Sequence, residues 1–300
     1  MPALPRRPDL LRARLQRFSR TLPGVEAGQV RAVHHARVAS RRLREVLPML
    51  QLDPETSRKL IERLRRVTRR LGRIRELDVL LQFIGDFKRR KLFPERALDY
   101  LAVDVREARD KRLEKTTHKR ATSELKRVSR KLEKVLRRLD ARSSQPNDRA
   151  WRWALEARAA RRAAALDKAI AKAGSLYLSD RLHDVRIAVK KLRYAYELVV
   201  EASGEQGAAD LRTLKRSQQL LGRIHDLDVL IARARRAQSA LAPAEAQLGK
   251  DLDVIVLGLD RDCRRLHGRY VRDRRALSAI THRLIARSLP GKASTLRQAG

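Results

Sequence analysis

Cysteine is almost absent from this sequence. Cys263 is the only one among 300 residues, so neither an internal disulfide nor a cluster of thiolate metal ligands can form. A chain of this composition does not depend on an oxidising compartment. We therefore expect a cytoplasmic location.

Long apolar runs are also missing. The longest, residues 254–259, is far shorter than the roughly 20 residues that span a bilayer. Residues 1–15 are interrupted by prolines and charged residues, so they lack the apolar stretch of a signal peptide. The sequence predicts a soluble protein that is not exported and has no membrane partner.

Acidic residues are scarce relative to basic ones. The chain has 35 Asp and Glu against 71 Lys and Arg, which gives a formal net charge of +36. Such an excess repels the compact state until counterions or a ligand neutralise it, and it favours a polyanionic partner. Because 43% of the residues are hydrophobic, the chain has enough apolar material for a core and is not a disordered basic tail.

What the sequence does contain is apolar residues at helical spacing, and strand-like alternation is not found. We predict an all-α fold. The predicted helices are residues 8–22, 28–50, 55–75, 78–91, 95–115, 119–140, 150–173, 179–202, 206–224, 228–241, 244–270 and 272–288. The polar segment 142–149 is predicted to link a first half, 1–141, to a second half, 150–288, and residues 289–300 to form a disordered tail.

Two segments of the chain occur twice. Residues 34–44 return as 183–193, and residues 71–80 return as 221–230, where only Arg75 and Glu76 are replaced, by His225 and Asp226. Such self-similarity marks a duplicated structural unit. In each half about four helices could close a bundle around an apolar core.

The second repeated segment contains a glycine and an aspartate in each copy. Gly72 and Gly222 are costly inside a helix unless a neighbour packs closely or the helix turns, and we expect a tight corner there. Asp78 and Asp228 precede an apolar run, which predicts that each caps the start of a new helix.

The first repeated segment has a cationic front opposite an apolar back. At 100° per residue, four side chains of each copy fall within an arc of about 80°. They form the first basic row, His34, Arg37, Arg41 and Arg44, and the second basic row, His183, Arg186, Lys190 and Arg193. We expect these fronts to lack the acidic residues four positions on that balance an exposed helix. Rows of arginine and lysine suit a chain of phosphates, since arginine grips phosphate oxygens bidentately.

The histidines that begin the rows have two open interpretations: each could donate to an anion or to a neighbouring helix. A metal site is disfavoured, because the field is strongly positive and the same face supplies no carboxylate. The pairs His183-Asp184 and His225-Asp226 are similar to those of metal-dependent HD-type phosphohydrolases. No further histidine and aspartate set accompanies them, so we expect no metal, no cofactor and no catalysis.

These motifs resemble the CHAD family, the conserved histidine α-helical domains. The matching segments are His34-x-x-Arg37-x-x-x-Arg41-Arg42-Leu43-Arg44, His183-x-x-Arg186-x-x-x-Lys190-Lys191-Leu192-Arg193-Tyr194 and the two Leu-Gly-Arg-Ile-x-x-Leu-Asp stretches. The resemblance covers roughly residues 8–288. It implies two pseudo-symmetric helical bundles around a basic groove or pore, binding of inorganic polyphosphate without hydrolysis, and an association with polyphosphate granules.

The resemblance also implies a set of polyphosphate-binding residues on the repeated helices and on those that follow them. They are His34, Arg37, Arg41, Arg42, Arg44, Arg66, Arg73, His183, Arg186, Lys190, Lys191, Arg193, Arg216 and Arg223. The chain is similar to members that stand alone, without a fused triphosphate-processing domain.

Nucleic acid is the second candidate partner. A chain of this charge would attract RNA or DNA non-specifically through their phosphates. Aromatic residues, however, make up only 4% of the sequence and are not interleaved with the basic rows. Stacking on single-stranded bases is therefore poorly supported, and phosphate is favoured over base as the group recognised.

Overall fold

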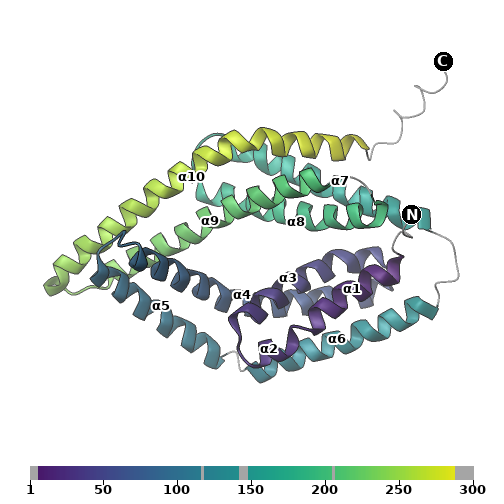
Figure 1. Cartoon of the computed structure of the whole chain (residues 1–300), viewed down its shortest axis with the longest axis horizontal. Helices are drawn as coiled ribbons and strands as arrows, with labels where there is room; N and C mark the ends of the chain where they lie inside the picture. Colours follow the sequence, from purple (N-terminus) through teal and green to yellow (C-terminus); the bar gives the residue numbers. More distant parts are fainter. Residues whose placement is uncertain (1–5, 116–117, 142–147, 205–206, 288–300) are drawn as a thin grey trace, which may run out of the picture. The chain divides into compact units, whose positions relative to one another are not determined.

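The computed structural model describes residues 6–115, 118–141, 148–204 and 207–287 (Figure 1). The helices are α1 (Arg7–Ser19), α2 (Leu22–Glu26), α3 (Val30–Val46), α4 (Pro54–Arg89), α5 (Glu95–Lys115), α6 (His118–Ala141), α7 (Asp148–Ala173), α8 (Ser179–Ser203), α9 (Ala208–Ser239) and α10 (Ala246–Arg287), with 3-10 turns η1 (Leu47–Met49) and η2 (Pro243–Glu245). No strand occurs within these ranges, and the all-α prediction is confirmed. None of the described helices carries an apolar stretch that could cross a bilayer.

Two of the predicted segments fall wholly or largely on residues that the structure does not describe. Most of the predicted linker 142–149, and the predicted tail 289–300, lie outside the described residues, and α7 begins at Asp148.

Three predicted helix breaks are wrong. Helix α4 runs unbroken through Gly72 and Asp78, α9 through Gly222 and Asp228, and α10 through Tyr270. The predicted corners and caps therefore do not exist, and each pair of predicted helices is one long helix (Figure 1).

The reason for one of these errors is a contact between helices. Asp78 is buried in the middle of α4, with 5% of its surface exposed. Its carboxylate accepts a hydrogen bond at 2.7 Å from Nε of Arg109 on α5. The aspartate thus stabilises the α4–α5 pair and does not cap a helix, which local sequence cannot reveal.

The described contacts divide the chain into two compact units. Among the described residues, the first unit holds those of 7–141 with 226–263, and the second holds those of 148–225 with 264–287. Residues 226–263 belong to the second copy in sequence, yet they pack with the helices of the first. The division of the sequence repeat into two halves, 1–141 and 150–288, and the pseudo-symmetry of these halves stay predictions.

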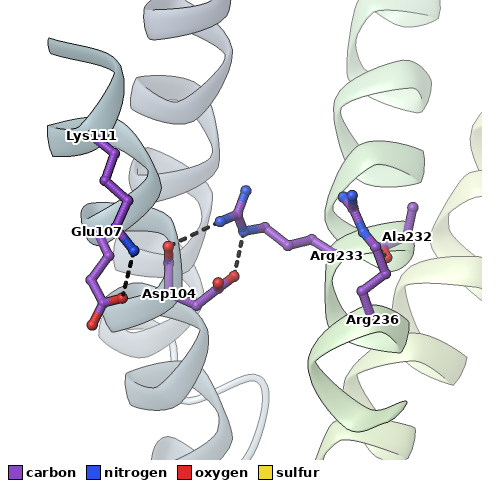
Figure 2. A network of polar contacts seen from close by, with 6 residues as sticks. All are labelled: Asp104, Glu107, Lys111, Ala232, Arg233 and Arg236. Carbon is purple, nitrogen blue, oxygen red and sulfur yellow. Dashed lines mark hydrogen bonds and ion pairs between the residues drawn. The ribbon is translucent and has the colours of Figure 1, made fainter. Parts of the chain in front are cut away.

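The first unit holds residues 226–263 through specific contacts with α5 and the turn before it. Arg233 on α9 donates to both the carboxylate and the carbonyl oxygen of Asp104 on α5, the latter at 2.9 Å (Figure 2). On α10, a Cβ added to Gly258 would lie 2.4 Å from the ring of Phe93, so a larger residue would clash there. These contacts fix the position of the segment within the unit.

The apolar backs of the repeated helices form the cores of their units. On α3, Ala36, Leu43 and Val46 are buried, as the helical period predicts. On α8, Val185 and Leu192 are buried in the same way. The cationic fronts therefore point away from these cores.

Candidate polyanion-binding surfaces

The first basic row begins at an exposed His34 and continues through the half-buried Arg37, Arg41 and Arg44 of α3. Arg37 lies over Gly72 of α4, with its Nη1 3.4 Å from the carbonyl oxygen of the glycine. A Cβ at position 72 would lie 3.4 Å from Nη2 of Arg37. The repeated glycine leaves room for the arginine where α3 and α4 cross.

The second basic row repeats this arrangement on α8 and α9. The atom nearest to a Cβ added at Gly222 would be Nε of Arg186, at 4.0 Å. Both repeated glycines thus face the repeated arginine of the preceding helix. Neither glycine lies at a turn, and a Cβ at either position would meet the arginine at ordinary contact distance.

The histidines of the two rows have different neighbours. His183 faces His225 of α9, with ring centroids 4.8 Å apart and the two Nδ1 atoms at 3.4 Å. In the first unit the residue that matches His225 is Arg75, and the ring closest to His34 is that of His35, at 5.7 Å. His183 thus has a contact between helices, whereas His34 is exposed.

Burial and nearby cations lower the pKa values of His34, His183 and His225. Burial, followed by Arg186, His183 and Lys190, lowers the pKa of His225 to about 4. Burial and then Arg186 lower the pKa of His183. The His34 side chain is exposed at the surface, yet the protein atoms around it partly desolvate the ring, and this effect, followed by Arg75, lowers its pKa. An anion on either row would oppose these shifts, because negative charge favours the protonated ring.

The expectation that the fronts lack balancing acids is wrong at the end of the second row. Arg193 forms an ion pair with Glu197, four residues on, donates from Nε to Gln218 at 2.8 Å and lies 4.5 Å from the centroid of the Tyr194 ring. In the first row a buried Glu45 likewise follows Arg41 by four residues. Arg193 is therefore already engaged by three side chains of its own unit.

The remaining predicted residues have mixed environments. Arg66 of α4 lies 3.7 Å from the carboxylate of Glu124 on α6, a partner that sequence spacing could not show. Arg216 is exposed and donates weakly to Thr213 at 3.5 Å. The exposed Arg73 and Lys191 have no ion pair with any described residue. Arg223 is half-buried on α9, and Arg42 is half-buried on α3, where it lines a cavity.

Arg42 helps to line a cavity of about 560 Å³ within the first unit, which we call the arginine cavity. It involves α1, α2 and α3, and its lining includes Arg14, Arg17, Arg20, Arg31, His34, His35 and Arg42. Sequence reasoning missed the α1 arginines because they are not repeated in the second half. Their spacing of three residues, which places them along one side of a helix, was the available signal.

The described residues contain no group of three His, Cys, Asp or Glu side chains placed to share a metal ion. Asp184 of the first His-Asp pair is exposed, 4.0 Å from Nζ of Lys172. His183 of the same pair contacts His225 instead. The two residues thus serve separate contacts.

Comparison with known proteins agrees with the fold and the motifs. No curated protein matches the sequence. Among solved structures, PptA from Streptomyces chartreusis matches with a TM-score of 0.58 and 20% identity, over 94% of this chain and 97% of that one. The CHAD domain from the plant Ricinus communis matches with a TM-score of 0.50 and 21% identity, over 93% and 90%. At these identities the likeness is one of fold.

The family is shown by the sequence itself. The family model described as CHAD domain matches residues 9–235, a range that includes both basic rows and both repeated glycines. The chain therefore belongs to the CHAD family.

Proposed function

We propose that this protein binds inorganic polyphosphate, without hydrolysing it, through the two basic rows. The observation that carries the proposal is the arginine–glycine crossing found in both units, Arg37 over Gly72 and Arg186 over Gly222. It holds a guanidinium in each row in a similar setting. Membership of the CHAD family, which is associated with polyphosphate binding, supports the same ligand.

The chemistry of the rows suits closely spaced phosphates. Guanidinium groups bind phosphate oxygens bidentately, and their binding releases counterions from the polyanion. Because Arg37, Arg41 and Arg44 are half-buried on one helix, they lose less side-chain freedom on binding than fully exposed arginines would. In the second row Arg193 is already paired with Glu197, so a phosphate there must compete with that carboxylate.

Nucleic acid is less well supported as the ligand. Base recognition in single strands uses exposed aromatic side chains. The aromatic residue that directly follows a row, Tyr194, is only 5% exposed and lies beside Arg193. We therefore expect phosphate contacts without base contacts, in a cytoplasmic protein that could act at polyphosphate granules.

The test is a competition at near-physiological salt. Labelled long-chain polyphosphate is displaced by unlabelled polyphosphate or by RNA of matched total charge, and anisotropy is measured. We expect polyphosphate to be the better competitor. Equal or better competition by RNA would overturn the proposed ligand.

A pair of variants tests the site. Arg37→Ala with Arg41→Ala should weaken binding by roughly tenfold or more, because hydrogen bonds to charged groups contribute about 1.5 to 3 kcal/mol each. The matched control is Arg58→Ala with Arg65→Ala, two exposed arginines of α4 that have no ion pair with described residues. Equal losses in both variants would indicate that only net charge matters.

Turnover is tested separately. Incubation with polyphosphate and with nucleoside triphosphates, with and without Mg²⁺ or Mn²⁺, should release no orthophosphate. Steady release that Asp184→Ala or Asp226→Ala abolishes would establish a phosphohydrolase instead.

A further inference from the structure

We propose that the arginine cavity is a second anion site, which binds a compact oligophosphate. It lies within the first unit, between α1, α2 and α3. This site does not depend on the proposed role of the rows, because its arginines on α1 belong to neither of them.

The residues that line the cavity carry positive charge and include no acidic residue to balance it. Five arginines and two histidines line it, and none of the lining residues is Asp or Glu. Arg17, Arg20 and Arg31 make no side-chain hydrogen bond or ion pair with any described residue. Cations gathered in this way repel one another unless an anion lies between them.

Other arginines of the same unit are paired with carboxylates. Arg12 on α1 pairs with Asp140 at 2.7 Å, and Arg109 pairs with Asp78 at 2.7 Å. The chain can therefore supply a carboxylate to an arginine where one is needed for packing. For Arg17, Arg20 and Arg31 of the cavity the described residues supply none, which is expected of a site that an external anion completes.

The walls of the cavity are set by close packing. Arg14 is only 5% exposed, and its Nη1 donates to the carbonyl oxygen of Leu10 at 3.2 Å, so the guanidinium is held in place. A Cβ at Gly24 would lie 2.6 Å from Cβ of Ala32 and 2.7 Å from Oε1 of Gln29. The volume of about 560 Å³ falls in the range of small-ligand pockets, about 300–1,000 Å³.

The lining indicates the class of ligand. Several guanidinium groups from two helices suit an anion with many oxygens in more than one direction, and arginine matches phosphate bidentately. Besides the two histidines, no lining residue has an aromatic ring, and the apolar ones are Ala32, Val38 and Ala39. Nothing here favours a nucleobase or a large apolar group, so a bare oligophosphate fits best.

The cavity and the first basic row lie on different faces of α3. At 100° per residue, Arg31, His35 and Arg42 lie on one side of the helix, and Arg37, Arg41 and Arg44 on another. His34 lies between the two sets and also lines the cavity. The oligophosphate has two sources, a free short molecule or the end of a long polyphosphate chain.

The first experiment is calorimetric titration with inorganic triphosphate at near-physiological salt. We compare wild type, the triple variant Arg17→Ala, Arg20→Ala and Arg31→Ala, and a control triple variant Arg127→Ala, Arg130→Ala and Arg137→Ala on α6. All six residues are exposed and lie in the first unit, and the two variants lose the same charge. Melting temperatures verify that both remain folded.

The cavity variant should lose affinity for triphosphate by roughly tenfold or more, and the control by less than about threefold. Absence of triphosphate binding to wild type, or equal losses in the two variants, would overturn the site. The proposed role of the rows is tested separately, by measuring the binding of long polyphosphate to the variant Arg37→Ala with Arg41→Ala.

A second titration distinguishes the sources. If the cavity takes chain ends, triphosphate competes with long polyphosphate, and the cavity variant also binds the long chain more weakly. If it takes a free molecule, triphosphate binds with unchanged affinity to protein already saturated with long polyphosphate. Either result supports an oligophosphate site, provided the cavity variant abolishes the triphosphate binding.

Discussion

At the scale of single residues, the two glycines of α4 predict different outcomes for the same substitution by alanine. Alanine is favoured over glycine inside a helix by about 0.8 to 1 kcal/mol. No atom lies within 4 Å of a Cβ added at Gly85, whereas at Gly72 the nearest is Arg37 Nη2 at 3.4 Å. Gly85 therefore serves as the control for Gly72.

Gly85→Ala should raise the free energy of unfolding by about 0.5 to 1 kcal/mol and leave polyphosphate binding unchanged. Gly72→Ala should gain less and weaken binding by about threefold to tenfold, because the added methyl group would contact the Arg37 guanidinium and restrict its position. Urea unfolding and a binding titration measure the two effects. Unchanged affinity of Gly72→Ala would show that the position of Arg37 does not matter.

His225 predicts a dependence of stability on pH. Its pKa falls from 6.5 to about 4 in the folded protein, so the unfolded chain binds the proton more readily between these values. The free energy of unfolding therefore decreases as pH falls from 6.5 towards 4, and no loss from this group occurs above 6.5. The half-buried ring is partly screened by solvent, so we expect a contribution of roughly 1 kcal/mol.

The measurement compares urea unfolding of wild type and His225→Gln from pH 7.5 to 4.5. Carboxylates titrate in both proteins, and only the difference between the curves reports the histidine. The variant should lose less stability on acidification. Parallel curves would mean that the ring is not held neutral.

At the scale of elements, Arg233 joins α9 to α5. It donates to the carboxylate and the main-chain oxygen of Asp104 (Figure 2), and its side chain is mostly buried, with 16% exposed. Arg233→Ala should lower the free energy of unfolding by about 1 to 3 kcal/mol, because it removes charge-assisted hydrogen bonds.

The control is on α5, the helix that carries Asp104. Lys111 and Glu107 form an exposed pair on α5, and Lys111→Ala should cost less than about 0.5 kcal/mol. A double-mutant cycle of Arg233→Ala with Asp104→Ala isolates the pair energy. A coupling near zero would show that the contact does not hold α9.

The sequence could predict elements from their periodicity but not their junctions. The apolar back of α3, with Leu43 and Val46 buried, follows from the helical period. In the sequence alone, Gly72 and Asp78 look like signals of a turn. Their contacts with Arg37 and Arg109, which the sequence does not show, are what place them inside a helix. Likewise the repeat pointed to the rows, while the α1 arginines of the cavity became visible only when α1 and α3 were placed together.

At the scale of the whole molecule, the net charge of +36 predicts opposite effects of salt on stability and on binding. Raising NaCl from about 50 to 200 mM should raise the melting temperature of the free protein, because screening weakens self-repulsion. The same change should weaken polyphosphate binding by at least about tenfold through counterion release. Calorimetry and a binding titration in one salt series measure both. Affinity that does not depend on salt would contradict phosphate recognition by the rows.

The two rows lie in different units, and if both bind polyphosphate as proposed, a long chain should gain affinity by engaging both. Once one row is bound, the second contact is intramolecular. We compare two double variants, Arg37→Ala with Arg44→Ala and Arg186→Ala with Arg193→Ala. Each should weaken long-chain binding by far more than the factor of about two that the loss of one of two separate sites would cause. Either variant retaining wild-type affinity at half the stoichiometry would indicate independent sites.

The packing of residues 226–263 with the first unit also has a consequence in time. During synthesis, α5 emerges more than a hundred residues before its partner, since Asp104 and Arg233 are 129 positions apart. Contacts between residues so far apart in sequence slow folding. Until residues 226–263 have been synthesised, the first unit therefore cannot complete its packing, and part of its apolar surface stays uncovered. A ribosome-bound chain stalled before residue 226 should therefore be protease-sensitive in α5, and one that exposes residue 263 should be protected.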